Sequence, residues 1–395
     1  MVARLISNIK LPILLFIVSR LIFIAAMPLE ALRGYGDFSH FYNLSKLGAP
    51  YFDFWVEFPP LFPFLSALIS WLSAGREHVY DYLLVFILTA AQVVSLGIFL
   101  RLADKIHRGK AAERRGWIYF GLLLGLAYGW WYFDPLAVML QMLGLLWILD
   151  QKVIQAGVAI GLGILLKFFP GLLLVVAWWS LPFRKALNVT LIACGIVLLV
   201  YGSLMLTSPA MTIASLRSQG SKGSWETIWA LIDGNLQTGN FGSLNERSDP
   251  ETALLLRGNP AQVPAWLSLI PFVGLGVLIL SRKAPEDDLQ RIALLGLTWG
   301  LFLLWSTGYS PQWVLYLLPV ILLILPEKEA LLFGFAFIFV NLLEWPVLLS
   351  RGYFWGLWLT VPLRYVLLIL FSYSCVRIYL SKAIPEPIRP VIGLP

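Results

Sequence analysis

Two carboxylates in an aromatic-rich segment near the N-terminus are the side chains best suited to chemistry. Asp37 follows a Gly-Tyr-Gly turn, and Glu57 stands directly before a Phe-Pro-Pro run. Many aromatic rings lie between them in the sequence, and the planar faces of such rings suit sugars. This pattern favours recognition of a sugar, with Tyr35, His40 and Tyr42 as contacts. The simpler interpretation is an aromatic belt at a membrane interface, with Asp37 as a turn residue.

A second polar segment, residues 220–247, combines turn-forming residues with a short helical pattern. Ser224 is a plausible N-cap for a helix over 225–232. A loop this long is more often functional than idle, so we predict that it covers a bound substrate; the alternative is a solvated loop packed over the bundle. Candidate contacts to a sugar or an acceptor are Trp225, Glu226, Trp229, Asp233 and Asn235. Candidate cations are Arg217, Lys222 and Arg247.

Residues at the ends of apolar runs form a third set. Lys167 lies near an expected outer turn, and the turn GYSPQW (308–313) contributes Tyr309 and Gln312. Asp134 opens an apolar run just before a proline. Its carboxylate is either functional or only a helix N-terminal charge.

Two arginines, Arg20 and Arg364, lie inside apolar runs. Ionisable residues at membrane depth are functional hypotheses by default. The simpler interpretation is an internal ion pair, for which Glu344 is the carboxylate at a similar depth.

The elements that must position these residues are membrane helices. The chain has 395 residues, of which 59% are hydrophobic and 13% charged, whereas soluble domains have about 45–50% apolar and about 25% charged residues. One helical bundle uses about 20 apolar residues per span. A single all-α integral membrane domain therefore accounts for residues 1–395. Twelve apolar stretches are expected to span: 11–29, 82–101, 117–133, 135–150, 154–167, 168–181, 186–207, 264–281, 289–307, 311–325, 329–350 and 354–378.

The distribution of basic residues orients these spans. Residues 60–72 are too few to cross a bilayer comfortably, so they either span it or lie on its surface as a juxtamembrane helix. The surface placement brings the basic loop 101–115 and most of the 29 basic residues to the cytoplasmic side. Both termini are then cytoplasmic, and segments 30–81 and 208–263 are external. We expect a multi-pass protein of a prokaryotic cell membrane, whose net charge of +7 reflects orientation and not nucleic-acid binding.

The order of several short motifs resembles that of the GT-C polytopic glycosyltransferases. These motifs are Gly36-Asp37, Glu57 before Pro-Pro, the AG…G…LLKFFP stretch from Ala156 to Pro170 and the SPQW turn at 310–313. Within that class the chain looks most like the polyprenyl-phosphate-mannose-dependent α-mannosyltransferases, a group that includes phosphatidylinositol mannoside mannosyltransferases. The resemblance runs through most of the chain as topology and sparse motifs.

The resemblance implies a GT-C-type bundle, juxtamembrane helices in segment 30–81, an extracytoplasmic active site and inversion at the anomeric carbon. It implies that Asp37 is the general base and Glu57 a supporting carboxylate. An attacking hydroxyl must lose a proton, whereas a phosphate leaving group needs cations more than a general acid. Candidates for those cations are Lys167, Arg217, Lys222 and Arg247.

The expected partners are a polyprenyl-phosphate sugar donor, with mannose as the sugar, a lipid or glycan acceptor, and membrane lipids. No cofactor is expected, because the lipid-phosphate sugar is a substrate. The spacing gives no support for a divalent metal, although His40 near Asp37 could be a ligand. The main alternative is a transporter or flippase of a lipid-linked sugar or small solute, which also has about twelve spans. Polar residues gathered in two external segments favour the enzyme.

Overall fold

The structure, a computed structural model, describes residues 2–381, which form helices joined by loops and contain no β-strand. The all-α prediction is therefore confirmed for these residues, while the predicted cytoplasmic C-terminus, 382–395, lies outside them. The α-helices are α1 (Val2–Ala26), α2 (Leu29–Arg33), α3 (Phe38–Leu44), α4 (Leu61–Leu72), α5 (Glu77–His107), α6 (Gly109–Gly125), α7 (Tyr128–Trp131), α8 (Asp134–Leu149), α9 (Val153–Leu166), α10 (Leu173–Ser180), α11 (Phe183–Thr207), α12 (Pro209–Ser221), α13 (Ile228–Asp233), α14 (Ala265–Leu280), α15 (Asp288–Trp305), α16 (Val314–Ile324), α17 (Glu327–Leu342) and α18 (Leu357–Leu380). Short 3-10 or π turns are η1 (Phe169–Leu172), η2 (Leu244–Glu246), η3 (Pro250–Leu254), η4 (Pro311–Trp313), η5 (Leu343–Leu348), η6 (Leu349–Arg351) and η7 (Phe354–Gly356).

Four helices in the described part of the chain are long and apolar enough to cross a membrane. They are Glu77–His107, Phe183–Thr207, Glu327–Arg351 and Phe354–Leu380. Shorter apolar helices occupy other predicted stretches; α8, for example, has 16 residues and is about 24 Å long. The total of twelve spans stays a prediction.

The shorter apolar helices differ in how much of their surface the protein covers. Every residue of α16 is buried, so this uniformly apolar helix forms part of the core. In α14, by contrast, only Ser268 and Ile279 are buried, and its large apolar side chains face outward. An outer helix of this composition requires an apolar surrounding such as lipid.

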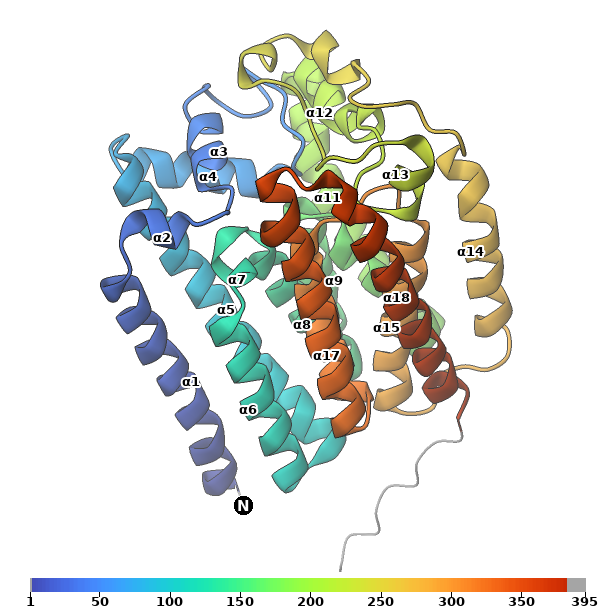
Figure 1. Cartoon of the computed structure of the whole chain (residues 1–395). Coiled ribbons are helices and arrows are strands. Elements are labelled where there is room, and N and C mark those ends of the chain that lie inside the picture. Colours follow the sequence, from blue (N-terminus) through green and yellow to red (C-terminus); the bar gives the residue numbers. More distant parts are fainter. Residues whose placement is uncertain (1, 382–395) are drawn as a thin grey trace, which may run out of the picture.

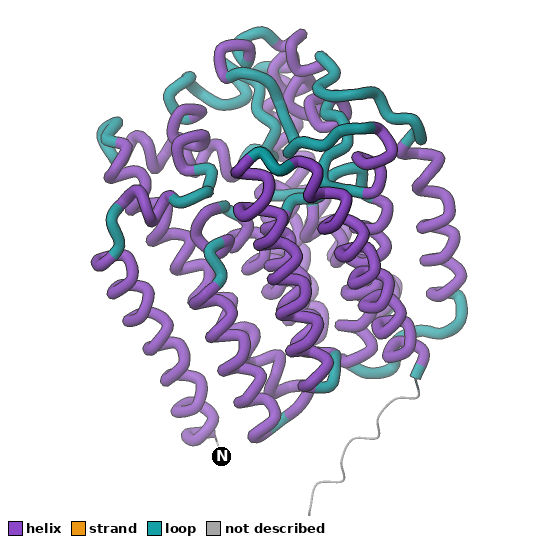
Figure 2. Tube along the Cα trace, in the orientation of Figure 1, coloured by secondary structure: helices purple, strands orange, loops and turns teal. Residues whose placement is uncertain are grey.

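The short helices and long loops gather at one end of the bundle. Figure 1 shows α2, α3, α4, α12 and α13 at the upper end of the long helices, and Figure 2 shows the longest loops at that same end. Helix α4 has 12 residues, or about 18 Å of length, which is too short to cross an apolar core of about 30 Å. The two segments predicted to be external, 30–81 and 208–263, thus contribute to one end of the molecule.

The two arginines within apolar helices have different surroundings. Arg364 forms an ion pair with Glu344 at 2.6 Å, and both side chains are fully buried, so the simpler interpretation of Arg364 is confirmed. Arg20 forms no ion pair among the contacts of residues 2–381; it donates to the carbonyl of Leu123 at 2.5 Å and lies 4.4 Å from the ring centre of Trp130. A carbonyl and an aromatic face thus stand in place of a counter-ion for this buried guanidinium.

Candidate active site

Asp37 is held at the start of α3 by a close contact between two backbones. Its amide donates to the carbonyl of Trp131 at 3.1 Å. A Cβ atom on the preceding residue, Gly36, would lie only 2.6 Å from that same carbonyl oxygen. The Gly-Asp pair of the sequence therefore has a steric reason, because only glycine lets the chain approach this closely.

The carboxylate of Asp37 is half-buried and free. Among the contacts between described residues it makes neither a side-chain hydrogen bond nor an ion pair, and it does not cap its own helix. Burial raises the pKa of Asp37 to about 6, and the positive charges of His40 and Lys167 act against that rise. A carboxyl group with this pKa is a competent base near neutral pH.

Glu57 is neutralised, unlike Asp37. It is 3% exposed and forms a two-pronged ion pair with Arg247, in which the longer contact is 3.2 Å. His40 Nε2 lies 3.2 Å from Glu57 Oε1. Burial acts to raise the pKa of Glu57, but Arg247 and His40 together hold it below its usual range. Glu57 is thus an anionic partner for two groups and no proton acceptor for a substrate.

Arg247 also joins the two external segments. Its guanidinium lies 4.7 Å from the ring centre of Trp55, and the Trp55 amide donates to its carbonyl at 3.0 Å. The amide of Val56 donates to Ser215 Oγ on α12 at 3.0 Å. These contacts fix the loop before Glu57 against the second segment.

Lys167 is neutralised by Asp134. The two side chains are 2.7 Å apart, with 15% and 1% exposed. Lys167 follows α9 and Asp134 opens α8, so the ion pair ties two helix ends together. The Lys167 ammonium also faces aromatic rings, of which Phe133 is 5.0 Å away and Trp313 5.8 Å away.

Lys222 is a cation without a carboxylate partner. Its ammonium lies 3.4 Å from the ring centre of Trp225 and 3.9 Å from that of Phe241, and it forms no ion pair among the described residues. Burial lowers the pKa of Lys222 to about 7, although the negative charges of Glu57, Glu226 and Asp37 favour the charged form. Among the described residues, Asp37 is therefore a carboxylate without an ion pair, and Lys222 is an ammonium group without an ion pair that gives up its proton more readily than an ordinary lysine.

Trp225 of the second segment is hydrogen-bonded to the backbone around the turn GYSPQW. The Trp225 amide donates to Thr307, and the Tyr309 amide donates to Trp225, both at 3.1 Å. The indole lies against Gly308, where a Cβ atom would be 2.0 Å from the ring. Thr227 Oγ1 also donates to the carbonyl of Thr307, 80 residues away, at 3.1 Å. These contacts fix the second external segment to the turn.

Several other predicted contacts support the segments themselves. Asp233 accepts from Ser224 at 2.6 Å, and Asn235 is bonded to both Ser224 and Asn259, so both residues close the loop around α13. Tyr42 is buried and donates to the carbonyl of Gly75. These side chains stabilise the fold of the two segments, and among the described residues none of them forms a hydrogen bond with the Asp37 carboxylate.

The remaining predicted residues vary in exposure. Tyr35 is 43% exposed and packs edge-on against Trp131. Arg217 is exposed on α12, with no ion pair among the contacts of residues 2–381. Gln312 and Trp229 are half-buried, and the indole nitrogen of Trp229 has no hydrogen-bond partner in the described structure. Glu226 and Tyr309 are buried together beside Arg364.

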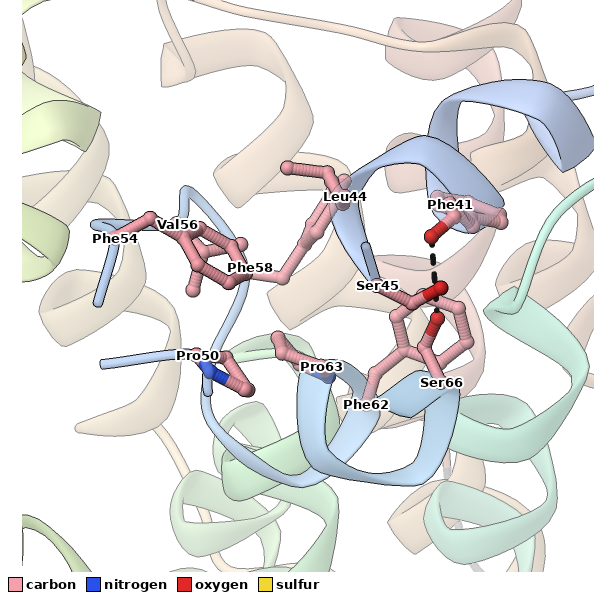
Figure 3. A pocket seen from close by; sticks show the side chains of 10 residues that line it. All are labelled: Phe41, Leu44, Ser45, Pro50, Phe54, Val56, Phe58, Phe62, Pro63 and Ser66. Carbon is pink, nitrogen blue, oxygen red and sulfur yellow. Dashed lines mark hydrogen bonds between the residues drawn. The ribbon is translucent and has the colours of Figure 1, made fainter. Parts of the chain in front are cut away.

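A small apolar pocket lies within the first external segment, between α3, α4 and the loop before Phe58. Figure 3 shows its aromatic and proline side chains, with Ser66 donating to the carbonyl of Phe41 at 3.3 Å. No charged residue lines it. The pocket packs the first external segment together and contributes no group for acid–base chemistry.

Two features of the site were not predicted from the sequence. Trp131 supplies the backbone acceptor for Asp37, and Phe241 supplies the second ring for Lys222. The glycine at position 36 was a sequence signal for the close backbone contact with Trp131. No local pattern distinguishes Phe241 from the other aromatic residues in loops. Within residues 2–381 no group of three or more His, Cys, Asp or Glu side chains is arranged to hold a metal ion.

The comparisons with known proteins give one similar structure. No protein-family model matches the chain, and no curated protein matches it significantly. The chain is similar to the oligosaccharyltransferase of Archaeoglobus fulgidus, whose crystal structure is in the apo form, with 12% sequence identity and a TM-score of 0.45. The match covers 94% of this chain and 56% of that protein, so the chain spans a little over half of its length.

Proposed function

We propose that this protein is an inverting glycosyltransferase that moves a sugar from a polyprenyl-phosphate donor to a hydroxyl of a lipid or glycan. The observation that carries the proposal is the free carboxylate of Asp37 beside carboxylates that are already neutralised. Glu57 is paired with Arg247, and Asp134 is paired with Lys167. Asp37 alone of the three lacks a cation within hydrogen-bonding distance among the described residues.

Asp37 is the general base in this proposal. The acceptor hydroxyl oxygen forms a bond to the anomeric carbon and transfers its proton to Asp37, while the bond from that carbon to the phosphate oxygen breaks. A single displacement of this kind inverts the anomeric centre. The raised pKa of Asp37, about 6, leaves most of the group ionised at pH 7 and still basic enough to take the proton.

Lys222 is the cation proposed for the departing phosphate. Lys167 and Arg247 each hold a carboxylate, and Arg217 is exposed on the outer surface of α12, so these three are ranked below it. The lowered pKa of Lys222, about 7, rises when a phosphate approaches, because an opposite charge favours the ammonium. The developing charge on the leaving group thus finds a donor already in place.

The apolar helices suit a donor that is dissolved in the bilayer. Four helices of the described chain could span a membrane. The helices of the two segments to which the proposed base and cation belong lie at one end of the bundle (Figure 1). A polyprenyl chain could remain in lipid while its phosphate and sugar reach that end. The proposed sugar is mannose, in line with the sequence resemblance, and the proposed side is extracytoplasmic.

The experiment is a transfer assay with purified protein in lipid. Wild type, Asp37→Asn and the control Glu30→Gln, which alters an exposed carboxylate of the same segment, receive radiolabelled polyprenyl-phosphate mannose and a crude lipid extract. We expect transfer by wild type and the control, and nearly complete loss in Asp37→Asn with an unchanged melting temperature. Equal transfer by Asp37→Asn would refute its role as base. Saturable solute uptake into vesicles without donor consumption would favour a transporter.

A further inference from the structure

A buried polar cluster lies where the second external segment meets α17, η5 and α18. Arg364 and Glu344 form its ion pair, at 2.6 Å and with both side chains 0% exposed. Tyr309 covers the guanidinium, whose Cζ is 3.8 Å from the ring centre. Glu226 is buried against the same pair and is 3% exposed. Two buried carboxyl groups therefore lie near a single arginine, and among the described residues only Glu344 forms an ion pair with it.

Glu226 is unusual in its backbone and in its side chain. Its φ angle of +53° lies in the left-handed region, which residues other than glycine rarely occupy. Its Oε2 atom is buried and has no hydrogen-bond partner among the described residues. Arg364 donates to the backbone carbonyl of Glu226, so the arginine holds the main chain of this residue while its charge is balanced by Glu344.

This backbone contact is one residue away from the proposed active site. Trp225 is bonded through its amide and carbonyl to the turn at 307–309, and its ring faces the Lys222 ammonium at 3.4 Å. Arg364 thus binds the backbone carbonyl of Glu226, while the backbone of the preceding residue, Trp225, is bonded to the turn. Holding Glu226 thus fixes the orientation of the residues that form the cation site.

The charge balance of the cluster decides the protonation of Glu226. Glu344 already neutralises Arg364 and also accepts from Thr360. A second buried negative charge would have no cation of its own, which is costly in a water-poor interior. Burial and the neighbouring Glu344 charge hold the pKa of Glu226 well above its ordinary range, while Arg364 and Lys222 act in the opposite direction. The other titratable groups that face Glu226 are Tyr128, Tyr132 and Tyr309.

We propose that Glu226 is a positioning residue that keeps its proton in the folded protein and, held by Arg364, seats the second external segment so that Trp225 and Lys222 face the site. The seated form binds the proton more tightly than the opened form. By linkage, seating is fully stable below the ordinary titration range of a glutamate, near pH 4.3, and weakens as pH rises toward the folded pKa. This inference goes beyond the proposed reaction and does not require it.

The first test compares melting temperatures of purified protein in lipid from pH 5 to 8. Glu226→Gln imitates the protonated side chain. The melting temperature of the variant minus that of wild type should therefore be at least about 2 °C larger at pH 8 than at pH 5. The control Glu251→Gln alters an exposed carboxylate of the same segment and should show no such trend. A difference between Glu226→Gln and wild type that is independent of pH would overturn the proposed proton.

The second test is hydrogen exchange of peptides covering 222–233, measured at a single pH of 6. Glu344→Gln leaves Arg364 without its anion and should accelerate exchange several-fold, whereas Glu226→Gln should not. Thr360→Val removes one bond to Glu344 and should accelerate exchange more weakly, which keeps the test available if Glu344→Gln does not fold. Unchanged exchange in both Glu344→Gln and Thr360→Val would overturn the proposed anchor. Neither test needs a sugar donor, so a failed transfer assay leaves both interpretable.

Discussion

In the proposed reaction, the pH dependence of catalysis is set by two groups whose pKa values are shifted toward each other. Asp37 must be ionised to act as the base, and its pKa is raised to about 6. Lys222 must be protonated to meet the phosphate, and its pKa is lowered to about 7. The value of kcat/KM should therefore rise through about pH 6, reach a narrow maximum between about 6 and 7, and fall above it.

Replacing Lys222 by arginine should remove the alkaline limb alone. One unit above a pKa of about 7, only about one lysine in eleven is still protonated. Wild type at pH 8 should therefore have roughly a tenth of the kcat/KM that full protonation would allow. Arginine stays charged throughout this range, so Lys222→Arg should fall less than about twofold between pH 7 and 8 while keeping the acid limb.

The assay measures initial rates of sugar transfer at low donor concentration from pH 5 to 9 at constant ionic strength. Lys46→Arg is the matched control, since Lys46 also lies on an aromatic ring, 4.0 Å from the ring centre of Tyr42, and should leave both limbs unchanged. An alkaline limb that persists in Lys222→Arg would refute the assignment. A wild-type profile that is flat between pH 7 and 9 would refute the lowered pKa itself.

Three further predictions concern the groups that hold the site together. Gly36→Ala places a Cβ atom 2.6 Å from a backbone oxygen and should lower turnover about 100-fold by displacing the base, with little change in donor KM. Arg247→Met removes the arginine partner of the buried Glu57 carboxylate and leaves, among the described residues, only its contact with His40. The change should cost about 3–5 kcal/mol of unfolding free energy, seen as a lower melting temperature; adding Glu57→Gln should recover most of it. Lys167→Met leaves the buried Asp134 carboxylate without its cation and should likewise lower the melting temperature. If adding Asp134→Asn did not recover the melting temperature, loss of the ion pair would not be the cause.

The residue types indicated which parts of the chain would carry polar chemistry. The two segments predicted to be external do gather at one end (Figure 1), because apolar runs of this length must pack side by side and leave their polar connections at the ends. The ion pair between Arg364 and Glu344 was also predictable, since a counter-ion lowers the cost of burying a guanidinium and Glu344 is the carboxylate at a similar depth.

The pairing among the site residues was not predictable in the same way. The chain offered four candidate phosphate cations, and no local pattern distinguished them. The structure pairs Arg247 with Glu57, which is 190 residues away, and Lys167 with Asp134. Lys222 is left free between two rings. Which cation is available depends on contacts between distant segments, and these do not appear as spacing within either segment.

The sequence by itself determined that the chain is helical and apolar, that polar residues concentrate in two segments, and that Gly36 and Asp37 stand together. These are properties of composition and of local backbone preference. Only the tertiary structure decided, for the described residues, that Asp37 is unpaired, that Lys222 lies between two aromatic rings without an ion pair, and that Glu226 lies beside Arg364. The physical reason is that the charge state of a buried group depends on its neighbours in space, and folding brings these neighbours from distant parts of the chain.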